Sequence, residues 1–135
     1  MELKELKPRK ALNIAFLKVK PNRTEIEGFK AHLITLLDRT NDTESEEFHK
    51  NLVSDFLKDT YYKQNHFINT KGRNDLVIHN GQNANTSVGV ILEAKKPTKR
   101  AEMMTTQKQN TKAFQELELY HLREGGDADT FMTVV

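Results

Sequence analysis

The chain has 135 residues, of which 36% are hydrophobic and 30% are charged, and its net charge is only +2. This length predicts a single domain with a modest core, and the composition excludes a disordered chain. The absence of cysteine excludes a disulfide scaffold or a thiolate metal site and fits a cytoplasmic protein. No apolar run is long enough to span a membrane, so we expect no membrane partner.

Charge is distributed unevenly along the sequence. Residues 7–10, 16–23 and 95–100 are basic, whereas residues 41–47 are acidic. A local basic patch matters more for nucleic-acid binding than the total charge does, so the net charge is only a weak indication of such a partner. The alternative for each stretch is an ordinary solvated face.

The first half of the chain is predicted to be helical. Pro8 can open a short helix with Ala11, Leu12, Ala15 and Phe16 on one side. A strongly amphipathic helix is predicted at residues 24–39, opened by a capping box of Thr24 and Glu27. A second capping box, Thr43 with Glu46, is expected to open a helix over residues 44–59.

The second half alternates strands and helices. A short strand is expected near His66 to Asn69, followed by a β-hairpin over residues 74–95 whose loop begins at Asn80-Gly81. Pro97 stops the hairpin, a long helix is predicted from Met103 to Arg123, and residues 130–135 are predicted to start another strand. The order predicts an α/β domain with a mixed sheet flanked by helices. Because the sequence stops within this apolar run, we expect residues 1–135 to be a single domain from the amino terminus of a larger protein.

The hairpin brings charged residues together at one end. If its loop is centred near Ala84, Asp75 lies opposite Glu93, with Cβ atoms about 5 Å apart. Because side chains alternate along a strand, Glu93 and Lys95 share the face of Asp75, and Ala94 takes the other face with Leu76, Ile78, Val90 and Leu92.

Two neighbouring carboxylates repel each other unless a cation compensates them. Mg²⁺ prefers oxygen ligands and usually takes one or two protein carboxylates, so Asp75 and Glu93 are predicted ligands, with the backbone carbonyl of Ala94 as a third. Lys95 would act near the attacking water and the scissile phosphate, either as a base if its pKa is lowered or by stabilising developing charge. The alternative is that these charges merely mark the end of a strand.

The stretches NDLVI and GVILEAK resemble the signature of the PD-(D/E)xK nuclease superfamily, with Asn74 where the signature has proline. The stretches SEEFHKNLVSDFLKDTYY, INTKGRNDLVIHNG and VILEAKKPTKRAEM resemble more specifically the amino-terminal endonuclease domain of fused restriction–modification (type IIG-like) enzymes of bacteria. The resemblance implies a restriction-endonuclease-like fold and a Mg²⁺-dependent DNA endonuclease. It also implies methyltransferase and target-recognition domains in the same full-length chain.

The resemblance implies further site residues. An acidic residue from an upstream helix is expected, and Glu46 is preferred to Glu47 because it lies beside the apolar stripe of its helix. A polar residue is expected from the helix after the E-x-K motif, either Gln107 or Asn110.

Double-stranded DNA is the expected partner. Its phosphates would be contacted by Arg73, Lys96, Lys99 and Arg100. Cleavage of both strands would require two sites and thus a transient dimer. Two alternative functions remain at this point: a stand-alone repair or junction-resolving nuclease of the same fold, and a non-catalytic DNA- or protein-binding module.

Overall fold

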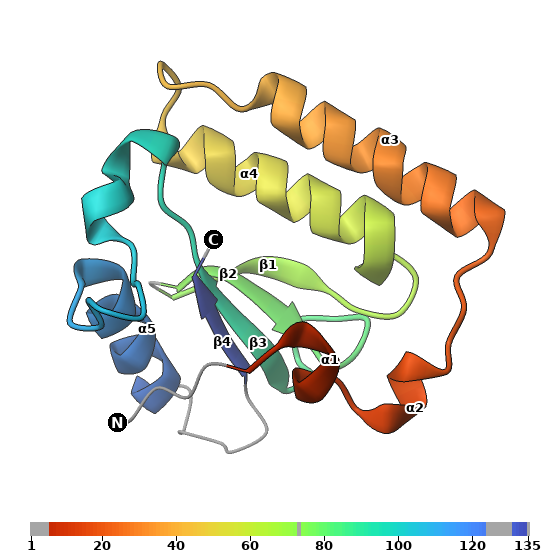
Figure 1. Cartoon of the computed structure of the whole chain (residues 1–135). Coiled ribbons are helices and arrows are strands. Elements are labelled where there is room, and N and C mark those ends of the chain that lie inside the picture. Colours follow the sequence, from red (N-terminus) through yellow and green to blue (C-terminus); the bar gives the residue numbers. More distant parts are fainter. Residues whose placement is uncertain (1–5, 73, 124–130, 135) are drawn as a thin grey trace.

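The centre of the structure is a four-stranded mixed sheet with the spatial order β1-β2-β3-β4 (Figure 1). The computed structural model describes residues 6–72, 74–123 and 131–134, without the side chains of 74, 75 and 131–134. The strands are β1 (Ile68–Lys71), β2 (Asn74–His79), β3 (Val88–Glu93) and β4 (Phe131–Val134). The first three pair antiparallel in chain order, and β4 pairs parallel to β3. The predicted mixed sheet is therefore present.

Helices cover both faces of this sheet. They are α1 (Pro8–Ala11), α2 (Ile14–Leu17), α3 (Arg23–Arg39), α4 (Glu46–Leu57) and α5 (Lys112–Arg123), with a π-helical turn at Lys58–Tyr62 and a 3-10 segment at Pro97–Glu102. α4 crosses one face with α3 alongside it, and α5 lies against β3 and β4 (Figure 1). Of the helices in the described ranges, none has the length and apolar character to cross a bilayer.

Two apolar cores lie on opposite sides of the β2–β3 hairpin. The core beneath α4 consists of Ile68, Leu76, Ile78 and Leu92, packed against Val53, Leu57, Tyr62 and Val90. The core beneath α5 consists of Val77, Ile91 and Leu117, packed against Val88 and Tyr120. Burial of both faces explains why β3 is apolar on both sides and does not alternate apolar with polar residues.

The predicted register of the hairpin is confirmed. Leu76 pairs with Leu92 and Val77 with Ile91, which is the register that a loop centred near Ala84 gives. His79, at the end of β2, has no exposed surface. One ring nitrogen lies 2.9 Å from the carbonyl oxygen of Thr86 and the other lies 2.9 Å from Oδ1 of Asn69. This buried ring of β2 therefore joins the loop to β1.

The predicted capping residues of the two long helices are wrong. α3 is opened by Asn22, whose Oδ1 accepts from the Glu25 amide at 2.9 Å while Oε2 of Glu25 accepts from the Asn22 amide at 2.7 Å. Asparagine is a better N-cap than threonine, so the helix begins one residue before Thr24. α4 begins at Glu46, because Oγ of Ser45 accepts from the Phe48 amide at 3.1 Å.

The predicted helix from Met103 to Arg123 is wrong over its first nine residues. Pro97 opens a short 3-10 segment, and α5 begins only at Lys112. Between them the amide of Lys108 donates to Oγ1 of Thr105 at 3.0 Å. Such side-chain bonds to nearby backbone favour turns over helix and account for the late start of α5.

The amino-terminal helix is also shorter than predicted. The chain forms two separate four-residue helices, α1 and α2, because Asn13 leaves the helical conformation. Its Oδ1 accepts from the Ala15 amide at 2.9 Å and so caps α2. Leu12 and Phe16, expected on one apolar side, are 52% and 68% exposed.

Candidate functional site at the end of the hairpin

Glu93 and Lys95 are buried where β3 ends. Glu93 is only 3% exposed, and the Lys95 side chain is 3% exposed. Nζ of Lys95 donates to Oε1 of Glu93 at 2.5 Å and to Oε2 of Glu116 at 2.9 Å. Oε1 of Glu46 lies 3.8 Å from the same nitrogen. One ammonium is therefore surrounded by carboxylates from β3, α4 and α5.

These neighbours keep Lys95 charged. Burial lowers the pKa of the Lys95 ammonium, but the hydrogen bonds and charges of Glu93 and Glu116 outweigh burial and raise that pKa above its ordinary value. Burial also raises the pKa of the Glu116 carboxyl, but hydrogen bonds with Lys95 and Glu93 and the charges of Lys95 and Lys112 together outweigh burial and lower that pKa. Of the two roles expected for Lys95, these surroundings favour stabilisation of negative charge over proton abstraction.

Asp75 belongs to β2, and its side chain lies outside the described residues. The register Leu76–Leu92, continued by one residue, brings the backbone of Asp75 opposite Glu93. Arg73 lies outside the described residues altogether. The hairpin geometry on which the Asp75 prediction depends is thus present at backbone level.

The two upstream acidic candidates have different surroundings. Glu46, in the first turn of α4, lies beside Lys95. Glu47 points elsewhere: its side chain is 65% exposed, and Oε2 lies 2.5 Å from Nζ of Lys50. Glu46 is therefore the residue of this pair that the fold brings to the end of β3.

The polar candidates after the E-x-K motif do not lie on a helix. Gln107 and Asn110 are both exposed and precede α5. Asn110 accepts a hydrogen bond from Nε2 of Gln115 through its Oδ1. The helix residue that reaches the site is Glu116, which was not predicted. A correct start for α5 would have indicated it, because Glu116 is three residues after the buried Ala113 and so lies on the same face of the helix.

Three of the predicted DNA-contacting residues, Lys96, Lys99 and Arg100, lie at the start of the 3-10 segment or within it. Lys99 is exposed, and its Nζ lies 3.8 Å from Oε1 of Glu102. Arg100 is exposed, and Lys96 is half-buried. These three side chains follow directly after Lys95 in the chain.

The carboxylates at the end of the hairpin are the type of ligand that a hard cation such as Mg²⁺ prefers. Glu46, Glu93 and Glu116 offer oxygen atoms only, the ligands that Mg²⁺ prefers, and they outnumber the cations Lys95 and Lys112 beside them. Ala94, the predicted carbonyl ligand, is 2% exposed. Over the described residues, no group of three acidic, histidine or cysteine side chains converges to hold a metal ion. A metal site here would thus depend on Asp75 as well.

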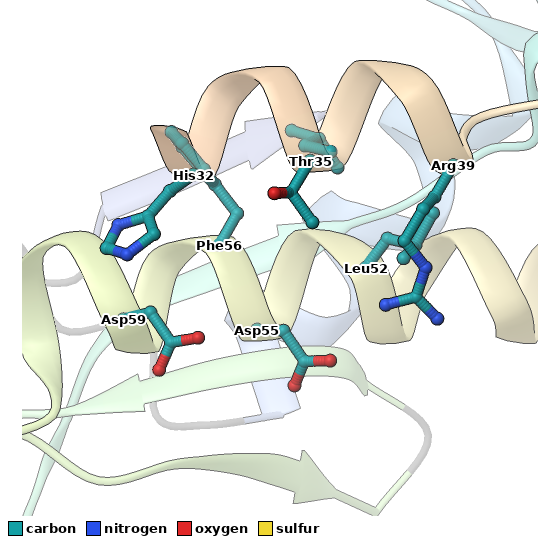
Figure 2. Close-up of a pocket in the computed structure, with 8 residues that line it drawn as sticks. His32, Thr35, Arg39, Leu52, Asp55, Phe56 and Asp59 are labelled. Carbon is teal, nitrogen blue, oxygen red and sulfur yellow. The ribbon is translucent and has the colours of Figure 1, made fainter. Parts of the chain in front are cut away.

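A separate groove of about 240 Å³ lies between α3 and α4 (Figure 2). Its lining residues are His32, Thr35, Leu36, Arg39, Leu52, Asp55, Phe56 and Asp59. His32 is held by a contact of 3.1 Å between its Nδ1 and Oγ1 of Thr60. None of the predicted site residues whose side chains are described lines this groove.

Comparison with known proteins identifies a family but no activity. No curated protein and no solved structure matches the chain. A family described as "Domain of unknown function (DUF7149)" matches residues 6–131, which is nearly the whole chain. The chain belongs to this family.

Proposed function

We propose that the chain is a Mg²⁺-dependent DNA endonuclease domain of the PD-(D/E)xK type, with a restriction-endonuclease-like fold. The observation that carries the proposal is the end of the β2–β3 hairpin, where Lys95 is buried among carboxylates and where the register of Leu76 with Leu92, continued by one residue, would bring Asp75 opposite Glu93. A buried cluster of charges is costly for a fold and is common at catalytic sites.

The carboxylates of Asp75 and Glu93 would hold the metal ion, together with the carbonyl oxygen of Ala94. Bound Mg²⁺ would polarise the phosphate and lower the pKa of a coordinated water. Because Glu93 is almost wholly buried, its carboxylate is held in one position before any ligand arrives. Such preorganisation reduces the reorganisation needed in the transition state.

Lys95 acts as a fixed positive charge. Its ammonium donates hydrogen bonds to Glu93 and Glu116, which orient it. In that position it would stabilise the negative charge that develops on the phosphate during in-line attack. Glu46 and Glu116 would serve as positioning residues, because their carboxylate oxygens lie 3.8 Å and 2.9 Å from Nζ of Lys95. Arg73, Lys96, Lys99 and Arg100 would contact neighbouring phosphates of the duplex.

The proposed context is the cleavage module of a bacterial restriction–modification enzyme that acts in the cytoplasm. Support for it comes from the stretches SEEFHKNLVSDFLKDTYY and VILEAKKPTKRAEM, which contain Glu46, Glu93 and Lys95. Methyltransferase and target-recognition domains would then choose the sequence, and two copies would meet transiently for cleavage of both strands.

A second candidate is a non-catalytic module in which Lys95 only ties α5 and α4 to β3. The burial of Lys95 and its ion pair with Glu116 of the neighbouring helix favour this alternative, because buried ion pairs can specify how elements pack.

Nicking of supercoiled plasmid DNA separates the two candidates. Wild type is compared with Glu93→Gln and Lys95→Met in the presence of Mg²⁺, with Glu47→Gln and Lys30→Met as matched controls at exposed positions. The nuclease proposal expects a loss of about 100-fold or more in both site variants and full activity in both controls. Equal nicking by all five proteins, with circular dichroism showing intact folds, would refute it.

A further inference from the structure

Residues 6–23 form a cationic segment that the candidate site does not use. They include six basic residues and no acidic residue: Lys7, Arg9, Lys10, Lys18, Lys20 and Arg23. Because the whole chain carries +2, the remainder carries −4. Positive charge is thus concentrated in one short part of a chain that is otherwise acidic.

The cationic segment presents these charges to solvent. Every residue from 6 to 23 is exposed. Across the described part of the chain, none of its six cations pairs with a carboxylate. α1 and α2 lie at the edge of the molecule, on the side away from the start of α4 (Figure 1). Neither packs extensively against another described element. Unpaired cations on a protruding segment are available to an external polyanion.

The composition of the segment favours nucleic acid over a protein partner. Four of its six cations are lysine, a residue depleted in protein–protein interfaces, whereas protein–DNA interfaces are strongly positive. A membrane-surface helix would need continuous polar and apolar faces. The break at Asn13 interrupts both faces in this chain.

We propose that the cationic segment is a second, sequence-independent contact with the phosphate backbone of duplex DNA, separate from the residues that follow Lys95. The inference rests on the proposed function, since it assigns to the segment the holding of that enzyme's substrate. Each cation that neutralises a phosphate releases a counterion, so the contact strengthens binding most at low salt.

The test measures fluorescence anisotropy of a labelled random-sequence duplex across a range of salt concentrations, in EDTA so that no cleavage occurs. One variant carries Lys7→Gln, Arg9→Gln and Lys10→Gln. A matched control removes the same charge at exposed positions elsewhere, with Lys30→Gln, Lys63→Gln and Lys108→Gln. We expect the salt slope of the first variant to fall by about 2.7, or 0.9 for each lost contact, so that its loss of affinity is about 40-fold larger at 50 mM salt than at 200 mM. The control should keep the wild-type slope.

Two results would overturn the inference. One is an unchanged slope in the Lys7, Arg9 and Lys10 variant. The other is a result that assigns the segment to a membrane surface. In that case the protein is retained on anionic phosphatidylserine vesicles, and Ile14→Ser and Phe16→Ser abolish this retention. Neither these substitutions nor the cation variant then changes DNA binding. Because binding is measured without Mg²⁺, a protein that binds through the segment but never nicks plasmid DNA would refute the nuclease proposal alone.

Discussion

The proposed roles of the hairpin end and of the cationic segment both depend on lysine side chains, which are buried in the first region and exposed in the second. Lys95 has a side chain that is 3% exposed and lies within hydrogen-bonding distance of two carboxylates. The lysines of residues 6–23 are exposed and pair with no carboxylate in the described part of the chain. A buried charge must be fixed by partners, whereas an exposed charge remains free to meet a ligand. The comparison therefore separates a preorganised site from an adaptable binding surface.

The largest expected difference between the two regions is in stability. Lys95→Met leaves Glu93 and Glu116 without their shared cation in a buried setting, and we expect the free energy of unfolding to fall by about 3–5 kcal/mol. Lys10→Met, at an exposed position, should change it by less than about 0.5 kcal/mol. Urea unfolding measures both. Similar values for the two variants would show that Lys95 is not held as described.

A smaller effect is expected at His79, which fixes the loop of the hairpin. His79→Phe keeps an aromatic ring at this position but removes both polar contacts. The Thr86 carbonyl and the Asn69 side chain then lack this partner. We expect a loss of about 1–3 kcal/mol in the free energy of unfolding. Hydrogen exchange should increase at amides of the loop before those of the β2–β3 pairs. Exchange that increases equally everywhere would contradict a local role.

The smallest effect tests the start of α3, which joins the cationic segment to the folded core. Asn22→Ala removes the observed capping box and should cost about 1 kcal/mol. Thr24→Ala removes the residue that the sequence pattern predicted as the cap and should cost almost nothing. Thermal unfolding distinguishes them, and a larger loss for Thr24→Ala would restore the sequence-based assignment.

The hairpin was predictable because local and global signals agree there. The polar loop beginning at Asn80-Gly81 and the apolar runs on either side specify one register, and Leu76 pairs with Leu92 accordingly. Lys95 lies two residues beyond the end of β3, and its ammonium contacts the carboxylate of Glu93, so alternation continued past the strand brought these two residues together in the prediction. The pKa of Lys95 was not predictable in this way, because it depends on burial, on Glu93 and also on Glu116, a contact 21 residues away in the sequence.

Helix boundaries were less predictable, and the site residues that depend on them were missed. Asn22 and Ser45 compete with nearby threonines for the same capping role, so the pattern alone identified the wrong residue. The turn at Thr105 delays α5, which leaves Gln107 and Asn110 outside the helix. At α3 the spacing allowed both caps, because Asn22 and Glu25 are three residues apart, as are Thr24 and Glu27.

The central claim is that the end of the hairpin holds a divalent cation. Addition of substoichiometric Mn²⁺, as a paramagnetic substitute for Mg²⁺, can locate that cation by broadening amide resonances of nearby residues. We predict broadening centred on Leu76 and on residues 93–95 in the wild type, and its loss in Glu93→Gln but not in Glu47→Gln. Broadening that is centred instead on Asp55 and Asp59 in the groove between α3 and α4, or that is unchanged in Glu93→Gln, would contradict the claim.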